Sequence, residues 1–341
     1  MRVRSSNSQL GGAGLDRAAG VLLGAAVGDA LGVPYEFAAR LGEGQEPRMA
    51  GGGLGPYEPG EYSDDTQMQV CVAEVAATGA DLREAGALDA IAGNFLRWVR
   101  GGASDVGAQT RAVLDAVGRA ASADADAGAG AGVGLGAVMG EAARAYAAGR
   151  ELSAGNGSLM RTGVVALAHL GDAAAMAEAA VAVGALTHPD PDCGDACVLW
   201  CSGIRTAVLS GTFDGVRGGL ELLPARRRDV WAARLDEAEA RPPHHFAHNG
   251  WVVHALQAAW SAIVRTPVPE AEPARHLRLA LEAAVRAGND TDTVAAIAGA
   301  LLGARWGRSG IPREWREAVH GWPGLNGEDL AELAVRTVRG G

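Results

Sequence analysis

The sequence predicts an all-α protein made of many helices of modest length. Alanine-rich segments carry apolar residues at positions i, i+3, i+4 and i+7, the spacing that places them on one face of a helix. No segment alternates convincingly between apolar and polar residues, and no hairpin dipeptide separates two β-branched runs. These observations favour a helical core without a sheet.

Six helices are predicted in the amino-terminal half of the chain. The first is built from small apolar residues, and its glycines permit close helix packing. The third ends where Gly101 and Gly102 follow it, because glycine commonly terminates helices. In order, these helices are Leu15–Leu31, Met68–Ala77, Ala87–Val99, Ala108–Ala120, Val138–Ala148 and Gly163–Leu170.

Six more helices are predicted in the carboxyl-terminal half. A rigid loop with two prolines, Thr187–Pro191, separates the first two of them. The last of them is very apolar and follows directly on a polar turn. In order, they are Ala173–Ala185, Asp195–Leu209, Val230–Glu239, Trp251–Val264, Ala274–Ala287 and Thr293–Trp306.

The domain organisation is expected to be simple. Residues 1–14 are predicted to form a disordered leader and residues 15–341 a single domain. The low-complexity segment Ala121–Gly136 is predicted to be a mobile surface loop, and Pro242–His245 lies in a second long connection. Neither should link two domains, because the two acidic clusters described below lie on opposite sides of both.

The composition excludes several classes of function. The net charge of −10, without a basic stripe, argues against a general nucleic-acid surface. All 30 basic residues are arginine, so there is no lysine to serve a P-loop, a Schiff base or a general base. Because 48% of the residues are apolar but only 5% aromatic, alanine, valine and leucine must fill the core.

The sequence also indicates where the protein acts. No apolar run reaches the roughly 18–20 residues that span a bilayer, and no secretory signal follows the first residues. Cys193, Cys197 and Cys201 recur at i, i+4 and i+8, where thiols on one helix face do not easily reach disulfide geometry and are best explained as core residues. We therefore expect a cytoplasmic protein that does not enter a membrane.

Two short acidic clusters stand out against apolar surroundings. Tyr62–Thr66 near the start and Gly288–Thr293 near the end each place two carboxylates and a hydroxyl within a few residues. Each precedes a helix, which one capping residue would be enough to begin. Buried carboxylates need a compensating cation or donor, and aspartate and hydroxyl oxygens suit Mg²⁺, Mn²⁺ or Ca²⁺ rather than zinc. We predict that folding joins the clusters into one site for two divalent ions, roughly 4 Å apart.

Other features are candidates that also have plain structural explanations. Gly155–Arg161 is a glycine-rich turn whose N–H groups could cradle phosphate, or it is an ordinary turn. His188 could donate to a phosphate or a ribose hydroxyl, or be structural. Trp251 could stack on a base or belong to the core. Asp29 and Glu36 could be functional acids, or capping or surface residues.

These elements, in this order, resemble the ADP-ribosylglycohydrolase family. The resemblance covers almost the whole chain and implies a compact orthogonal multi-helix bundle with two Mg²⁺ or Mn²⁺ ions in a central cleft. It implies an enzyme that hydrolyses the N- or O-glycosidic bond between ADP-ribose and an acceptor and releases ADP-ribose. The matching stretches are Gly20–Phe37, Tyr62–Met68, Gly155–Arg161, Thr187–Pro191, Gly250–Ala259 and Leu277–Gly307.

The resemblance also implies roles for single residues. One metal ion would be held by Ser63, Asp64 and Asp65, and the other by Asp290, Asp292 and Thr293, with Asp292 bridging. The ADP-ribose diphosphate and distal ribose would be lined by Asn156, Gly157 and Ser158, with His188 on the same ligand and Trp251 near the adenine. Glu36 matches a mobile acidic loop, and either Asp65 or Glu36 would be the general acid or base.

The acceptor stays open between arginine, serine, a nucleobase, O-acetyl-ADP-ribose and a small guanidine. Asn289 stands where many relatives carry glycine, and the segment His244–His248 has no family counterpart that we can place. Both departures concern the part of the cleft where the acceptor would lie. The partners we expect are ADP-ribose and ADP-ribosylated substrates, and we expect a monomer.

Two rival functions remain. A class I terpene synthase would also be helical and Mg²⁺-dependent, but Met68 and Ile297 stand where its acidic motifs need Asp and Glu. The alternative on the same fold is a catalytically silent ADP-ribose-binding or structural protein.

Overall fold

The computed structural model of the chain describes residues 10–42, 44–127, 134–150 and 152–340. The all-α prediction is confirmed: these residues form sixteen α-helices and almost no strand. The helices are α1 (Gly12–Gly32), α2 (Asp64–Ala76), α3 (Ala85–Arg100), α4 (Ala108–Ala127), α5 (Leu135–Ala148), α6 (Leu159–Thr162), α7 (Val165–Ala168), α8 (Ala173–Ala185), α9 (Pro191–Ser210), α10 (Gly215–Gly218), α11 (Ala225–Ala240), α12 (Val252–Arg265), α13 (Arg275–Val285), α14 (Thr291–Trp306), α15 (Arg313–Ala318) and α16 (Gly327–Arg339).

Short elements fill the connections between these helices. The strands β1 (His320–Gly321) and β2 (Leu325–Asn326) pair antiparallel in a small hairpin that the sequence reading did not anticipate. The 3₁₀ turns are η2 (Val33–Tyr35), η3 (Asn156–Ser158), η4 (Gly219–Leu222), η5 (Pro243–His245) and η6 (Arg308–Gly310).

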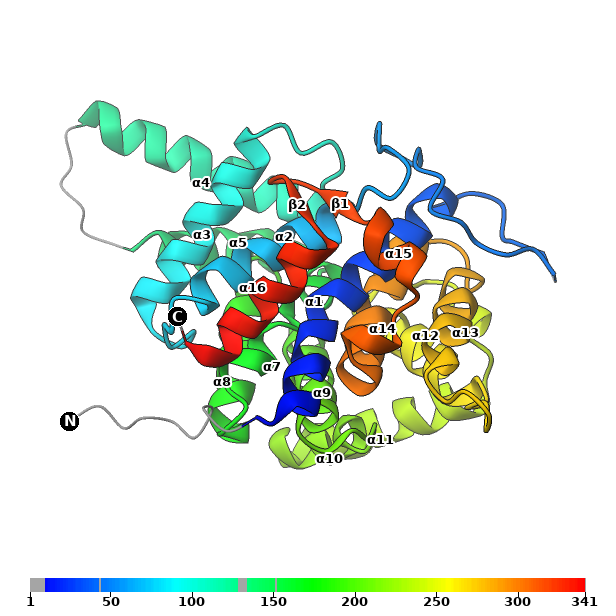
Figure 1. Cartoon of the computed structure of the whole chain (residues 1–341). Helices are drawn as coiled ribbons and strands as arrows, with labels where there is room; N and C mark the ends of the chain where they lie inside the picture. The colour runs from blue at the N-terminus through cyan, green and yellow to red at the C-terminus, as the bar shows by residue number, and fades with distance from the viewer. Residues whose placement is uncertain (1–9, 43, 128–133, 151, 341) are drawn as a thin grey trace.

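The centre of the molecule is the pair formed by α1 and α14, one from each end of the chain (Figure 1). Their backbones approach so closely that a Cβ added at Gly24 would lie 2.3 Å from the Gly299 carbonyl oxygen, and one at Gly28 would lie 2.0 Å from that of Ala295. Only glycine permits such an approach. At the end of the contact, a Cβ on Gly32 would lie 2.4 Å from the Cα of Asp292. The helix pair therefore fixes the second acidic cluster against the end of α1.

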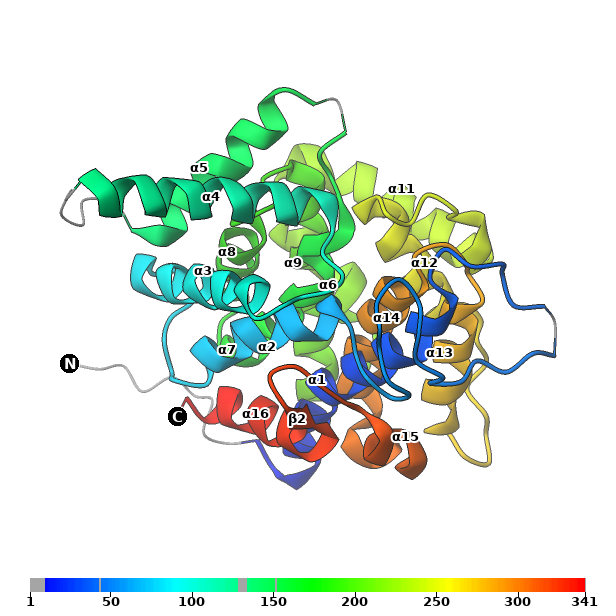
Figure 2. The ribbon, with the colours of Figure 1, turned by 90° about the horizontal axis from the view of Figure 1, so that it is seen from above.

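The remaining helices pack around this central pair. In Figures 1 and 2, α2 to α5 lie to one side of it and α11 to α13 to the other, with α8 and α9 packed together and α16 against α1. Alanine, valine and leucine supply most of the buried side chains, as the composition predicted, and Trp98, Trp200 and Trp231 are the largest of the fully buried ones.

One helix does pass the length and composition test for a membrane span, contrary to the run-length estimate from the sequence. It covers Gly12–Tyr35, 24 residues with a mean hydropathy of 1.4. However, 89% of its most apolar window is buried inside the protein, where α14 and α16 cover it. Its apolar character is thus explained by its place in the core.

Several predicted boundaries are wrong. The first helix begins at Gly12, inside the predicted leader, of which residues 1–9 lie outside the described part. Of the predicted loop 121–136, residues 121–127 continue α4 and 135–136 begin α5, and 128–133 are not described. The predicted helix Gly163–Leu170 is only the single turn α7, and α15 and α16 were not predicted. At 12–14 and 121–127, glycine and polar residues obscured the helix ends, because such segments can continue a helix without apolar periodicity.

Candidate active site

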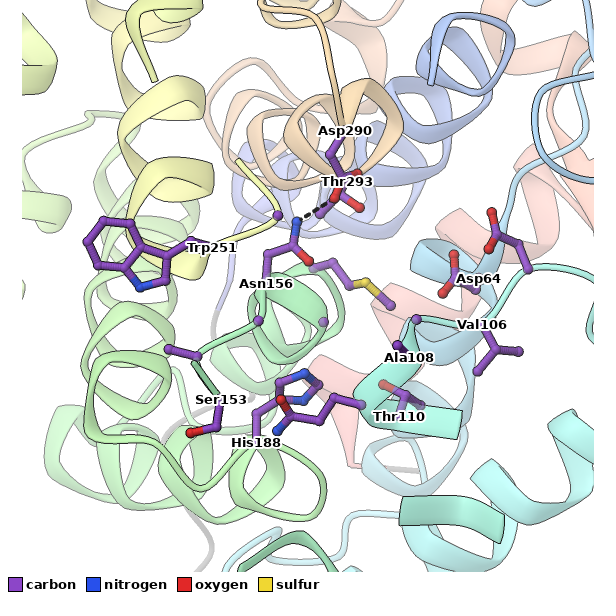
Figure 3. Close-up of a pocket in the computed structure, with 18 of the residues that line it drawn as sticks. Asp64, Val106, Ala108, Thr110, Ser153, Asn156, His188, Trp251, Asp290 and Thr293 are labelled. Carbon is purple, nitrogen blue, oxygen red and sulfur yellow. Dashed lines mark hydrogen bonds between the residues drawn. The ribbon is translucent and has the colours of Figure 1, made fainter. Parts of the chain in front are cut away.

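A cavity of about 820 Å³ opens where α2, α4, α9, α12 and α14 converge. Most of the residues singled out from the sequence line it or lie directly beneath it. Figure 3 shows Asp290 and Thr293 approaching from α14 and Asp64 from α2, with Asn156, His188 and Trp251 around the same space. The two acidic clusters, more than two hundred residues apart in the sequence, therefore meet at one cavity.

The first cluster is positioned by Asp29 on α1. This carboxylate is fully buried and accepts four hydrogen bonds: from the backbone N–H of Ser63 (2.9 Å) and of Thr66 (3.0 Å), and from their hydroxyls (2.8 Å and 2.6 Å). Burial is the largest cause that raises its pKa, to about 6. Asp29 thus caps the first turn of α2 from a different helix. From the sequence alone, Asp29 could be a functional acid, or a capping or surface residue.

Asp64 and Asp65 occupy the first turn of α2, four residues before the predicted start of that helix. Asp64 lines the cavity, whereas Asp65 is fully buried beneath it. The Oδ2 atom of Asp65 lies 3.2 Å from the hydroxyl oxygen of Ser63, whose proton goes to Asp29, and accepts from the hydroxyl of Thr293 (3.5 Å), the first direct link between the clusters. Its Oδ1 atom is buried without any hydrogen-bond partner. A buried carboxylate oxygen left without a partner indicates a missing ligand.

The second cluster begins α14. Asp290 precedes the helix and accepts a hydrogen bond from the side-chain amide of Asn156 (2.8 Å), while its N–H donates to the side-chain oxygen of Asn249 (3.1 Å). Asp292 lines the cavity although it is almost wholly buried, and it accepts from the N–H of Thr293 (2.9 Å). The hydroxyl of Thr291 turns away and donates to the Gly32 carbonyl (2.9 Å).

The donor set fits a hard divalent cation. Carboxylate oxygens of Asp29, Asp65 and Asp292 all lie within 4.8 Å of one another, and those of Glu36, Asp105 and Asp292 form a second such group. Burial, followed by the charges of neighbouring carboxylates, raises the pKa of Asp64, Asp65 and Asp292 well above the usual range. Oxygen ligands crowded in this way, one of them unpartnered, suit a hard divalent cation such as Mg²⁺, Mn²⁺ or Ca²⁺.

Glu36 and Asp105 add an acidic rim that only partly follows from the sequence. Glu36 follows η2 and lines the cavity. Its pKa is raised to about 8, chiefly by burial and then by the charges of Asp105 and Asp290. Asp105 lies in the loop before α4, and burial is the main cause that raises its pKa. Sequence reasoning missed Asp105 because it stands alone in a glycine-rich loop and meets Glu36 only through the fold.

The glycine-rich segment supplies one wall of the cavity. Asn156 holds two partners at once, donating to Asp290 and to the Asn249 carbonyl (2.8 Å), and it lines the cavity together with Gly157. Ser158, predicted to line the same ligand, is fully buried and does not line the cavity. Ser158 is the last residue of the 3₁₀ turn η3, and its side chain is directed into the protein.

His188 and Trp251 complete this wall. The His188 ring lines the cavity, is almost wholly buried, and its Nδ1 lies 2.7 Å from the hydroxyl of Thr187. Burial is the main cause that lowers its pKa, to about 3. Trp251, just before α12, is 38% exposed on the rim rather than in the core, so its face is available for stacking. The start of α4 contributes Gln109 and Thr110, which no sequence signal distinguished.

Comparison with known proteins places the chain among enzymes of one kind. Residues 12–341 match the sequence profile of the family described as ADP-ribosylglycohydrolase. The chain is 28% identical to the ADP-ribosylarginine hydrolase Tri1 of Pseudomonas putida (strain GB-1), over 89% of this chain and 74% of that protein. It is also 28% identical to the ADP-ribosyl-[dinitrogen reductase] glycohydrolase of Rhodospirillum rubrum, over 88% of this chain and 89% of that protein.

The structure has a similarly broad counterpart. A chain of a solved ADP-ribosylglycohydrolase-related protein complex superimposes with a TM-score of 0.70 at 27% sequence identity, covering 96% of this chain and 98% of that one. The match therefore extends to the whole arrangement of helices and not only to the acidic motifs.

Proposed function

The chain belongs to the ADP-ribosylglycohydrolase family and is a glycosyl-bond hydrolase, and from this premise we propose that its cavity binds ADP-ribose and hydrolyses the bond between that group and an acceptor. The proposal depends on one observation: carboxylate oxygens of Asp65 and Asp292 lie close together near Asn156, and one oxygen of Asp65 has no hydrogen-bond partner. In the reaction, an oxygen of water bonds to the anomeric carbon of the ribose, the bond to the acceptor breaks, and the acceptor takes up a proton.

The ligands proposed for two Mg²⁺ or Mn²⁺ ions come from both clusters: Ser63, Asp64, Asp65, Asp290, Asp292 and Thr293. Asp29 joins the group by position but already accepts four hydrogen bonds, so we assign it to holding α2 in place. When bound there, the cations would neutralise the crowded carboxylates and supply electrostatic stabilisation to the ribose oxygens.

Proton transfer is better assigned to Glu36 than to Asp65. Glu36 lines the cavity next to Asp105, whereas Asp65 lies beneath the cavity floor. A general acid or base must come within hydrogen-bond reach of the reacting group. We therefore propose that Glu36 exchanges the proton with the reacting centre and that Asp65 serves as a metal ligand. Asn156, Gly157 and His188 would position the diphosphate and distal ribose, and Trp251 would stack on the adenine.

Arginine is the acceptor that the surroundings of the site favour. Glu36 and Asp105 place carboxyl oxygens at the rim of the cavity, and these can accept hydrogen bonds from the N–H groups of a guanidinium. One similar protein is named an ADP-ribosylarginine hydrolase.

We further propose that the protein acts as a monomer in the cytoplasm.

The proposal is tested by offering the purified protein a panel of ADP-ribosylated acceptors, including arginine, serine and O-acetyl-ADP-ribose, and measuring free ADP-ribose by mass spectrometry. We expect release from ADP-ribosylarginine with Mg²⁺ or Mn²⁺, loss of release in EDTA, and recovery when the metal is restored. Tight binding of ADP-ribose without release from any acceptor would instead support the silent-binder alternative. Full activity after thorough metal stripping would contradict the assignment of the acidic clusters.

A further inference from the structure

Behind the cavity wall lies Arg161 on α6, a buried cation. Its side chain is 0% exposed, yet no carboxylate of the described residues forms an ion pair with it. Burial lowers the pKa of the guanidinium to about 10, so the group remains charged near neutral pH. A buried charge without a counter-charge is destabilising, so it has to be compensated by hydrogen bonds. The partners in those bonds indicate which segments Arg161 positions.

Arg161 ties together two segments that form the cavity wall. Its Nη1 donates to the Gly157 carbonyl (3.1 Å) in the glycine-rich segment. Its Nη2 donates to the Gly184 carbonyl (3.3 Å) and to the hydroxyl of Thr187 (2.8 Å), in the turn that leads to His188. One side chain therefore sets the relative position of the glycine-rich segment and the histidine.

The contact with Thr187 also decides which nitrogen of His188 carries the proton. A guanidinium can only donate, so the Thr187 hydroxyl accepts from Arg161 and must direct its own single proton elsewhere. A hydroxyl oxygen could also accept a second bond, but among the described residues Nδ1 of His188, at 2.7 Å, is the one acceptor within hydrogen-bond distance of that proton. Nδ1 is therefore an acceptor, and the proton of the neutral ring lies on Nε2. Burial and the charge of Arg161 lower the pKa of His188 to about 3, in keeping with a neutral ring.

The protonated nitrogen faces the cavity beside the two glycines of the wall. A Cβ added at Gly155 would lie 3.2 Å from Nε2, and one at Gly157 would lie 3.0 Å from the adjacent ring carbon. The ring is wedged against these glycines, and the carbonyl of Thr187 is held by the side-chain amide of Gln109 (2.8 Å). Nε2 itself has no hydrogen-bond partner in the part of the chain that the structure describes, so its N–H is free to meet a ligand.

We propose that Arg161 is a positioning residue that acts through Thr187 to hold His188 as its Nε2–H tautomer, aimed to donate a hydrogen bond to an oxygen of the bound nucleotide sugar. The identity of that ligand rests on the proposed function. The tautomer does not, because it follows from the contacts of Arg161 and Thr187 alone.

The tautomer is measurable in the unaltered protein. Nitrogen-15 spectra of the full chain with labelled histidine, assigned with His188→Gln, distinguish a protonated Nε2 from a protonated Nδ1. We expect His188 to be neutral at pH 7 with its proton on Nε2. A proton on Nδ1 would overturn the proposal, whatever the protein hydrolyses.

The relay is tested with Thr187→Val, which keeps the shape of the side chain but removes its hydroxyl. We expect a loss of roughly tenfold or more in affinity for ADP-ribose, measured by calorimetry, together with loss of the uniform Nε2–H signal. Thr187→Ser should restore both, because it restores the hydroxyl. The matched control is Thr337→Val, which removes a buried hydroxyl that donates only to the Leu333 carbonyl of its own helix (3.0 Å), and it should leave affinity unchanged.

The remaining variants distinguish the loss of His188 positioning from general damage to the fold. If Thr187 acts only through His188, Thr187→Val should cause little further loss in a chain that already carries His188→Ala. Equal, additive losses would overturn the relay, as would unchanged affinity in Thr187→Val. Should Thr187→Val fail to fold, Thr187→Ala provides the same comparison. If the unaltered protein does not bind ADP-ribose at all, the proposed function fails, but the spectra still decide the tautomer.

Discussion

Asp65 and Asp292 are the residues on which the two halves of the site depend most directly. Each is buried, each belongs to a different cluster, and their carboxylate oxygens lie within 4.8 Å of each other. We predict that Asp65→Asn and Asp292→Asn each lower the rate of ADP-ribose release by roughly 10²-fold or more, because each removes a negative metal ligand while leaving the shape unchanged. Release is measured at saturating Mg²⁺, with circular dichroism to establish that the fold is kept.

Asp172→Asn is the matched control for these two variants. Asp172 caps α8 outside the cavity, and asparagine caps a helix about as well, so this variant should keep full activity. Near-normal turnover in Asp65→Asn or Asp292→Asn would contradict the two-ion assignment.

The raised pKa values of other acids at the site predict how the stability of the metal-free protein changes with pH. A carboxyl group whose pKa is raised in the folded state keeps a proton that the unfolded chain has already lost, so its contribution to stability is present at low pH and is lost as pH rises. The pKa of Glu36 is raised to about 8, so its contribution is still being lost up to about pH 8, whereas that of Asp29, raised to about 6, is already lost near pH 6. We predict that in EDTA the melting temperature falls between pH 6.5 and pH 8, and that Mg²⁺ raises it more at pH 8 than at pH 6.5.

This window avoids the opposing effect of His188. Its folded-state pKa of about 3 is lowered, so it destabilises the protein only below about pH 6.5, where the unfolded chain takes up a proton. The check is thermal melting in EDTA and in Mg²⁺ at several pH values across the window. A metal-free melting temperature that stays constant or rises toward pH 8 would show that these carboxyls are not raised as the structure indicates.

Single residues differed in how far the sequence could identify them. The two clusters were readable because their polar side chains are consecutive and stand between apolar segments. Asp105 and Arg161 were not readable as members of the site: the first is a lone acid in a loop, and the second is one arginine among 30 basic residues. What distinguishes them is a neighbour distant in sequence, Glu36 for one and Thr187 for the other.

At the scale of elements, the contact between α1 and α14 makes a sharp prediction about glycine. An added methyl group at Gly24 would lie 2.3 Å from the Gly299 carbonyl oxygen, which is backbone and cannot rotate away. Gly24→Ala should therefore force the helices apart and lower the free energy of unfolding by about 3 kcal/mol or more, and it should weaken Mg²⁺ binding because α14 carries Asp292. Chemical denaturation and metal titration measure the two effects.

Gly86→Ala is the comparison for that variant. Gly86 lies near the start of α3 with nothing within 4 Å of an added Cβ, so alanine should be neutral or stabilising by up to about 1 kcal/mol. Equal stability of the two variants would mean that the helices do not approach as closely as described.

Element types were more predictable than element ends. Long apolar segments correctly indicated the helices at the centre of the fold, because α1 and α14 are buried on nearly every side. Apolar periodicity is present in α16, but this helix was not predicted; its buried face carries Leu330, Leu333, Ala334 and Val338. Asn326 caps its amino end by accepting from the backbone N–H groups of Glu328 and Asp329. The start of α2 was placed too late, because that start depends on Asp29 from another helix.

At the scale of the whole molecule, the site exists only when both ends of the chain are in place. The first cluster follows the first helix, the second begins α14, and the contact between α1 and α14 joins them. The sequence could predict that the clusters meet but not how, because the path between them runs through helices whose arrangement depends on packing. The single-domain assignment, which follows from the same reasoning, remains a prediction.

Metal binding should therefore stabilise the molecule as one unit. A ligand that binds only the folded state adds about 2.7 kcal/mol at a hundred times its dissociation constant, and here the proposed ligands come from segments near residues 64 and 291. We predict a single calorimetric transition in EDTA that moves as a whole, by on the order of a few degrees, to higher temperature in Mg²⁺. Asp292→Asn should abolish most of this shift while Asp172→Asn keeps it. A transition that splits, with one part insensitive to Mg²⁺, would mean that the clusters lie in units that unfold separately, contrary to one domain closed through its metal site.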